Sequence, residues 1–343
     1  MNKIVLYAIL LAVIIFAPFI FPDYRTQLAT LWLFIIVAMT WDMTGGQMGY
    51  NSLGNIFFYG TGMYVAAVIA IALVYDVGEY TGAAGGGRYD FTDAQYFTGF
   101  FLGILGAGLF CSITAFIIGY VTFGLRGPYF AIGTLGVAIA AGELVSNWDW
   151  VGGGQGITLP VYPADLDEGK LFIYATFAIT GVALFVFLNW LYKTRFGAAI
   201  NAIRDDEEKA EAMGIHTLRY KLVTWSLSAF FVGVVGGISA FQLISFEPLE
   251  SAYQTINLGI FMVVCVLLGG KGTLWGPIIG AIVFQVFKEV TWNYFLGWQW
   301  VALGALIVVT VVYFQDGIMG WLQQQKPEWF GLTVDEKEEE AKA

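Results

Sequence analysis

The sequence predicts an all-α protein that crosses a membrane many times, and three observations support this fold class. First, 58% of the 343 residues are hydrophobic, whereas soluble domains reach about 45–50% only when glycine is included. Second, only 12% are charged, about half of the roughly 25% found in soluble domains. Third, the apolar residues form long continuous runs instead of the alternating segments of a transmembrane barrel. A soluble globule could not cover this much apolar surface with polar side chains.

Ten apolar runs are long enough, or nearly so, to cross a bilayer, which requires about 20 residues. The first run has one alternative, a signal peptide, but it is longer than the usual apolar region of about 7–15 residues and lacks an A-x-A cleavage site. The eighth and ninth runs are short, and a Gly-Gly-Lys-Gly turn at 269–272 separates them. We expect about ten transmembrane helices, at 4–22, 26–44, 56–75, 97–123, 127–147, 170–191, 220–244, 256–270, 273–290 and 297–314.

The distribution of basic residues predicts the orientation of these helices. If the N-terminus is cytoplasmic, 12 of the 16 lysines and arginines fall on the cytoplasmic side, and only Arg25, Arg88, Lys170 and Lys288 fall outside. Cytoplasmic loops carry an excess of Lys and Arg, so we expect both termini inside. The predicted organisation is a transmembrane permease domain at 1–317 and a cytoplasmic acidic tail at 318–343, which is expected to be partly disordered.

Composition also excludes several function classes. The net charge of −10, without a basic stripe, argues against nucleic-acid binding. The single histidine, His216, and two isolated cysteines, Cys111 and Cys265, offer neither a catalytic triad nor a metal-ligand set. The GGKG turn departs from the phosphate-binding pattern, which requires Ser or Thr after the lysine. We therefore expect no catalytic residues, no metal and no bound cofactor in this chain.

Two glycine-rich segments, 45–64 and 268–281, are the most unusual features of the apolar region. Polar, glycine-rich backbone at membrane depth is tolerated where protein or a water-filled cavity surrounds it. Such segments are read in two ways, as broken helices that line a pathway or as sites of tight helix packing. On the first reading the candidate pathway-lining residues are Asn51, Ser52, Gly54, Thr134, Glu143, Gly269 and Gly270.

The long internal loop at 193–219 is predicted to be ordered. Apolar residues recur there at helical spacing, which predicts a short helix near 196–203 and a second near 206–213. Asp205 and Glu208 have the D-x-x-E spacing of a helix N-terminus. Gly214 suits the C-terminal cap of the second helix.

The charge of this loop predicts what it contacts. Helices that lie on a membrane surface usually carry excess Lys and Arg. Residues 205–211 instead carry five acids and one lysine. The sequence therefore favours docking of this loop into a protein partner.

Four strings together resemble a known family. They are GYNSLGNIFFYGTGMYVAA at 49–67, LRGPYFAIGTLGVA at 125–138, RFGAAINAIRDDEEKAEAMGIHTLRYKL at 195–222 and LLGGKGTLWGPIIGA at 267–281, with Gly153, Gly154, Gly156 and Ile157 between them. In order and spacing they are similar to LivM-type permeases of ATP-binding-cassette (ABC) importers of branched-chain amino acids. Urea and amide permeases of the same superfamily share these strings, so the resemblance leaves the solute open between these classes.

The resemblance implies a multi-subunit importer in a bacterial inner membrane. A homologous second permease would complete the pathway, two cytoplasmic ATPase subunits would bind and hydrolyse ATP, and a periplasmic binding protein would deliver a branched-chain or other neutral amino acid. The loop would contain the coupling helix, with Glu211, Ala212 and Gly214 matching the family's E-A-x-G core. The coupling residues would be Asp205, Glu208, Ala210, Glu211, Ala212, Met213 and Gly214.

A second function class is a secondary transporter or channel that works alone. Ion-coupled transporters usually carry buried acids at mid-membrane depth. Here Asp42 and Glu143 lie near the ends of predicted spans, where hydrated carboxylates are expected. An intramembrane enzyme would need a nucleophile–base pair or metal ligands at membrane depth, and the sequence offers neither.

Overall fold

The computed structural model describes residues 14–82, 89–295, 297–313 and 316–325. Six of its helices are long and apolar enough to cross a membrane. They are α2 (Arg25–Gly45, preceded by η1, Pro22–Tyr24), α3 (Asn55–Ala72), α5 (Asp93–Thr122), α6 (Pro128–Ser146), α7 (Leu166–Leu191) and α10 (Thr217–Leu243).

Shorter elements complete the chain. Residues 14–20 are helical and lead into η1. The helices of the C-terminal part are α11 (Phe261–Gly269), α12 (Gly276–Tyr294), α13 (Gln299–Tyr313) and α14 (Gly317–Gln325), and two π-helical turns, η4 (Pro248–Ala252) and η5 (Thr255–Ile260), precede them. The loops contain α4 (Val77–Gly82), α8 (Arg195–Asp205), α9 (Glu207–Ala212), the 3-10 turns η2 (Asp149–Val151) and η3 (Gly153–Gln155), and the strands β1 (Ile157–Thr158) and β2 (Ser245–Phe246).

The structure supports a polytopic all-α membrane protein. The sequence predicted about ten spans, and six of the described helices have the length and hydropathy of a span. Most of the predicted first span, 4–22, lies outside the described residues. The predicted eighth span, 256–270, is divided between η5 and α11. In the segment predicted as a tail, α14 is helical up to Gln325, and residues 326–343 lie outside the described part.

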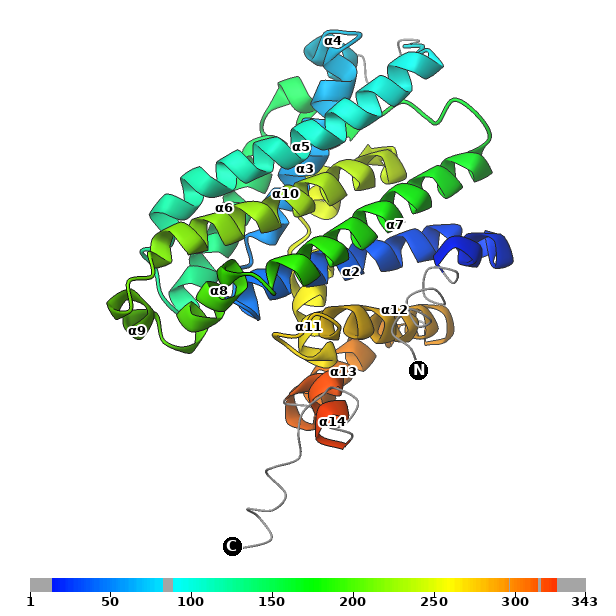
Figure 1. The fold of residues 1–343 in the computed structure, drawn as a ribbon. Coiled ribbons are helices and arrows are strands. Elements are labelled where there is room, and N and C mark those ends of the chain that lie inside the picture. Colours follow the sequence, from blue (N-terminus) through cyan, green and yellow to red (C-terminus); the bar gives the residue numbers. More distant parts are fainter. Residues whose placement is uncertain (1–13, 83–88, 296, 314–315, 326–343) are drawn as a thin grey trace, which may run out of the picture.

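Two groups of helices form the molecule (Figure 1). The first contains α3, α5, α6 and α10. The second places α11 and α12 beside α2, with α7 packed on α2 and with α13 and α14 packed on α11 and α12. Glycines set the close contacts of the first group, because a Cβ at Gly62 would overlap the backbone carbonyl of Gly233. Small residues allow such close approach between membrane helices. This contact fits the tight-packing reading of the glycines in α3.

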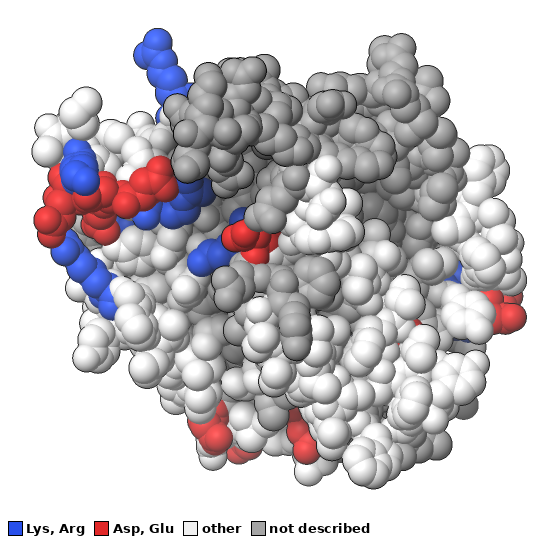
Figure 2. Space-filling model, turned by 90° about the horizontal axis from the view of Figure 1, so that it is seen from below, with Lys and Arg blue, Asp and Glu red and all other residues white. Residues whose placement is uncertain are grey.

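The outer surface of the bundle is apolar, as a lipid-facing surface must be. On α5 the exposed side chains include Phe101, Ile113, Ile117 and Tyr120. In the view from below, the largest group of charged side chains lies at the left edge, a second lies toward the centre, and smaller groups lie at the lower and right edges (Figure 2).

The two ends of the bundle differ in structure and charge. One, which we call the α9 end, carries α8, α9, the loop 46–54 and the α11–α12 turn at 270–275, whereas α4 lies at the opposite end (Figure 1). At the opposite end β1 and β2 pair antiparallel, with Ile157 facing Phe246. Arg25 and Lys170 flank helix termini there, and Lys288 lies within α12 over the ring of Phe34, not in a loop. The described basic residues of the α9 end are Arg126, Lys193, Arg195, Arg204, Lys209, Arg219, Lys221 and Lys271.

Candidate functional site

The loop between α7 and α10 forms two short helices with a sharp break between them. Thr194 caps α8 by accepting a hydrogen bond from the Phe196 amide (3.2 Å). Asp206 then adopts an extended conformation and caps α9, because its Oδ1 accepts a hydrogen bond from the Lys209 amide (3.0 Å). The sequence predicted this cap one residue earlier, at Asp205, which instead ends α8 and pairs with Arg204 (2.9 Å).

A glycine-based cap ends α9. Gly214 has φ +87°, a left-handed conformation that residues with a Cβ adopt only at a cost. The Gly214 amide donates to the Glu211 carbonyl (2.9 Å), and the Ile215 amide donates to the Ala210 carbonyl (3.0 Å). These two bonds form a Schellman motif, so Gly214 occupies the capping position that the sequence predicted.

The side chains of α9 divide into an inner and an outer set. Ala210, expected from the sequence to contact a partner, is 3% exposed and packs within this chain. Met213 is 84% exposed, and Glu208, Glu211 and Ala212 are also exposed. Met213 is thus a large exposed apolar side chain beside the acidic Glu208 and Glu211, and Met is one of the residue types enriched at protein–protein interfaces.

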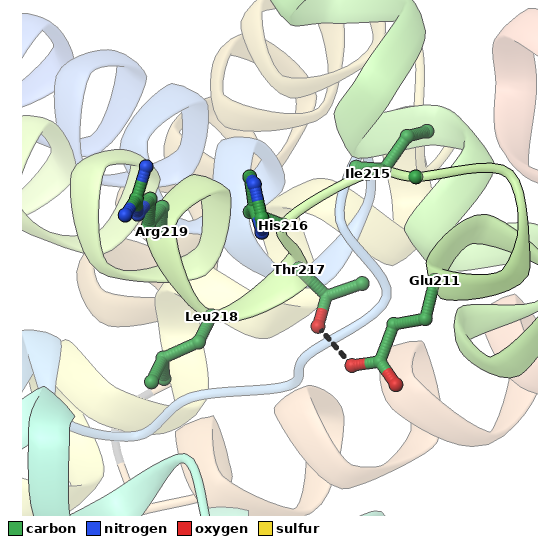
Figure 3. A pocket seen from close by; sticks show the side chains of 7 residues that line it. Glu211, Ile215, His216, Thr217, Leu218 and Arg219 are labelled. Atoms are coloured by element: carbon green, nitrogen blue, oxygen red, sulfur yellow. Dashed lines mark hydrogen bonds between the residues drawn. The ribbon is translucent and has the colours of Figure 1, made fainter.

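A surface depression of about 480 Å³ lies at the junction of α9 and α10 (Figure 3). Glu211 points toward Thr217 across it, and the Thr217 hydroxyl donates to Glu211 Oε1 (2.6 Å). This bond holds the end of α9 against the first turn of α10. The depression is also lined by Gly214, Ile215, His216, Leu218 and Arg219.

Beneath the outer surface, a buried ion pair holds α9 in place. Lys221 of α10 donates from Nζ to Glu207 Oε1 (2.6 Å) and to the Tyr50 hydroxyl (3.1 Å), and the Tyr50 hydroxyl also donates to Glu207 Oε2. The side chains of Lys221 and Glu207 are only 4% and 16% exposed. The ammonium also lies over the rings of Tyr50 (4.8 Å) and Phe123 (5.7 Å).

The pKa shifts in this cluster follow from these contacts. Burial alone would raise the pKa of Glu207, but the hydrogen bonds from Lys221 and Tyr50 outweigh it and lower the pKa below its ordinary value. Burial and the neighbouring Glu207 raise the pKa of the Tyr50 hydroxyl. Glu207 is therefore a carboxylate at neutral pH, and Tyr50 is a neutral donor.

A second polar contact joins the loop 46–54 to the α11–α12 turn. Asp42 Oδ1 accepts from the Gly272 amide (2.7 Å), and the Gln47 side chain donates to the Gly272 carbonyl (2.7 Å). Lys271 donates from Nζ to Asn51 Oδ1 (3.1 Å). Asp42 is 2% exposed, so it is a buried acceptor and not the hydrated carboxylate that the sequence suggested.

The candidate pathway-lining residues do not form one set. Ser52, Gly54 and Thr134 are buried at a junction in which the Leu53 amide donates to Thr134 Oγ1 (3.1 Å) and the Gly54 amide donates to Ser52 Oγ (3.0 Å). Asn51 is exposed at the α9 end, and Glu143 is exposed near the far end of α6.

Gly269 and Gly270 are buried at the end of α11. The sequence analysis did not single out Tyr50, Glu207 and Lys221. Tyr50 lies far along the chain from the two residues that it contacts.

Among the described residues, no group of three His, Cys, Asp or Glu side chains is placed to hold a metal ion.

Comparison with known proteins gives a family match over most of the chain. The family described as branched-chain amino acid transport system / permease component matches residues 23–312. No solved structure matches the chain.

Individual relatives extend from amino acid to sugar permeases. The high-affinity branched-chain amino acid transport system permease protein LivM of Escherichia coli is 26% identical over 325 residues, which cover 87% of this chain and 74% of that protein. The probable branched-chain amino acid transport permease protein LivM of Methanocaldococcus jannaschii is 24% identical, over 52% of this chain and 54% of its own. The fructose import permease protein FrcC of Rhizobium meliloti is 26% identical, over 40% and 39% of the two chains.

Proposed function

The chain belongs to the family of branched-chain amino acid transport permease components, and from this premise we propose that it is the membrane-spanning permease subunit of an ABC importer. Its role is transport, and ATP is bound and hydrolysed by two separate cytoplasmic ATPase subunits. The observation that carries the proposal is the outward face of α9, where Met213 is 84% exposed on a helix with caps at both ends.

The proposed orientation follows from the charges at the two ends. The α9 end carries eight of the described basic residues, and cytoplasmic loops are the ones enriched in Lys and Arg. In the proposed topology the α9 end is cytoplasmic, both termini are inside, and ten helices cross the inner membrane. Residues 1–317 form the permease domain, and 318–343 form an acidic cytoplasmic tail.

The proposed partners are a homologous second permease, the two ATPases and a periplasmic binding protein. The solute is a branched-chain or other neutral amino acid, which agrees with the printed names of the LivM relatives. Urea or amide transport is the alternative within the superfamily. Equilibrium binding of each solute class to the proposed periplasmic binding protein separates these alternatives.

The docking assignment is tested on the exposed residues Ala212 and Met213. We expect Ala212→Asp and Met213→Asp each to abolish co-purification of the ATPases and solute uptake, because a charge is placed in an apolar contact. Met213→Leu is the matched control, since it keeps an apolar side chain of similar size. Wild-type uptake and retained ATPases in both Asp variants would show that α9 is not the docking helix.

The orientation is tested at Lys193, an exposed residue of the α9 end that lies outside the proposed docking helix. A Lys193→Cys variant is treated with a membrane-impermeant thiol reagent. The native Cys111 and Cys265 are buried and give little background. We expect labelling only after the cells are opened, whereas a Val161→Cys control at the opposite end should react in intact cells.

A further inference from the structure

The loop 46–54 contacts the proposed docking helix on one side and the α11–α12 turn on the other. On the first side, Tyr50 shares the buried cluster with Glu207 of α9 and Lys221 of α10. Gly49 lies directly against Arg204 of α8, since a Cβ at this glycine would come within 3.1 Å of Arg204 Cγ. A displacement of α8 and α9 therefore pushes on residues 49 and 50 directly.

On its other side, the same loop holds the turn at 270–275. Gln47 bonds to the Gly272 carbonyl (2.7 Å), and Asn51 accepts from Lys271 (3.1 Å). The Gly272 amide is fixed by Asp42 (2.7 Å), at the end of α2. Three bonds from the segment 42–51 therefore hold two consecutive residues of the turn.

The loop between these contacts is tied to the end of α2. The Gln47 amide donates to the Asp42 carbonyl (2.8 Å), and the Tyr50 amide donates to the Thr44 carbonyl (2.9 Å). The Tyr50 ring packs edge-on against Phe123 (5.5 Å) and Phe130 (5.3 Å). Residues 46–51 and the end of α2 are thus joined into one body.

The turn that this body holds belongs to an interrupted membrane segment. η4 and η5 are π-helical, and α11 that follows has only nine residues. π-helical turns occur frequently at functional sites, and broken helices at membrane depth are tolerated where they line a cavity or are buried in protein. Movement of the turn is transmitted to α11 and α12 together, because it connects them.

We propose that residues 46–51 are a relay that transmits displacement of the ATPase-docking helix α9 to the α11–α12 turn, with Glu207, Lys221 and Gln47 as its positioning residues. The proposal rests on the proposed function, because it assumes that α9 receives the ATPase. The Glu207–Lys221–Tyr50 cluster is the input contact, and the Gln47–Gly272 bond is the output contact.

The test uses the full complex with its ATPases and binding protein in proteoliposomes. The double variant Glu207→Gln/Lys221→Met removes both buried charges, so that neither is left unpaired. Gln47→Ala breaks the output contact, and Arg126→Gln, in an exposed pair with Glu208 (3.6 Å), is the control. We expect the double variant and Gln47→Ala to keep ATPase assembly and ATP hydrolysis, while solute taken up per ATP falls at least fivefold. The control should take up as much solute per ATP as the wild type.

A triple variant, which combines Glu207→Gln/Lys221→Met with Gln47→Ala, distinguishes a relay from two unrelated packing defects. In a relay with contacts in series, the triple variant should lose no more uptake per ATP than the worse of its parents. A wild-type ratio in the double variant, or losses that multiply in the triple variant, would overturn the proposal. Failure of the proposed function gives a different result, because the ATPases would then not co-purify with the wild-type chain.

Discussion

The side chain of Gln47 donates a 2.7 Å hydrogen bond to the carbonyl oxygen of Gly272, 225 residues further along the chain. The amide of the same glycine donates to Asp42 Oδ1, so side chains from the end of α2 and the following loop satisfy both backbone polar groups of Gly272. Buried backbone groups need such partners. The two glycine-rich segments of the sequence thus meet at a polar contact between the loop 46–54 and the α11–α12 turn.

The buried pair Lys221–Glu207 should contribute much more to stability than the exposed pair Arg126–Glu208. Lys221→Met leaves a mostly buried carboxylate without its counter-charge, a change that costs about 3 kcal/mol or more. Arg126→Met removes a pair whose side chains are 66% and 83% exposed, and such pairs contribute about 0–1 kcal/mol.

The measurement for this pair is native-state cleavage of the 193–216 loop by a protease that does not cut at Lys or Arg. A loss of about 3 kcal/mol corresponds to an increase of about a hundredfold in the open population. Equal cleavage rates in the two variants would contradict the assignment of Lys221 to the buried cluster.

The Glu207 contact should make the position of α9 dependent on pH only in the acid range. The pKa of Glu207 is lowered in the folded state, so its stabilising effect is complete above the unfolded value of about 4.3. It is lost as the pH falls through the still lower folded value. Lys221, Tyr50 and Arg126 are the groups that face this carboxylate.

A fluorophore on an Ala212→Cys variant reports this dependence. We expect a constant signal from pH 8 to about 5 and release of α9 at lower pH. The same probe in a Glu207→Gln background should show no such acid transition. A midpoint above pH 6 in the parent would mean that another group holds α9.

Composition and apolar runs predicted the fold class because they depend on local sequence alone. The loop helices were also predicted closely: α8 and α9 begin or end within two residues of the expected positions. The cap of α9 was misplaced by one residue because Asp205 and Asp206 are both competent caps, and the D-x-x-E spacing selected the first. In the structure Asp206 leaves the helical conformation and accepts from the Lys209 amide, whereas Asp205 stays in α8 and pairs with Arg204.

The buried cluster could not be predicted in the same way. Tyr50 and Lys221 are 171 residues apart, and neither belongs to a motif with recognisable chemistry. Helical spacing also did not predict which face of α9 is buried, because a six-residue helix completes fewer than two turns. This is why Ala210 was expected outside and lies inside.

Gly214 should resist substitution by any residue with a Cβ, although there is space for one. No heavy atom lies within 4 Å of a Cβ built there, but φ is +87°. Gly214→Ala should therefore cost about 1 kcal/mol through the backbone alone and loosen the end of α9. Gly136→Ala, at an equally open position with ordinary φ, is the control, and loop cleavage is the measurement. Similar cleavage of both variants would argue against the left-handed cap.

Gly269, at the contact between α11 and α12, should be among the most sensitive glycines of the part of the chain that the structure describes. A Cβ on Gly269 would overlap the carbonyl oxygen of Gly276, and one on Gly280 would overlap that of Cys265. These neighbours are backbone atoms, which cannot rotate away as a side chain can. Gly269→Ala must therefore push the two helices apart, with a loss of packing on both sides of the turn.

We expect Gly269→Ala to lower the thermal unfolding midpoint of the purified complex by several degrees and to reduce uptake by at least tenfold. The matched control is Gly304→Ala in α13, where a Cβ meets no atom within 4 Å; it should leave both quantities unchanged. The effect of Gly269→Ala is steric, but the atoms that the new Cβ meets belong to the backbone of Gly276 and Gly280. No side-chain truncation nearby should therefore rescue the variant. Rescue by a truncated side chain would show that side chains, and not the two backbones, set the separation of α11 and α12.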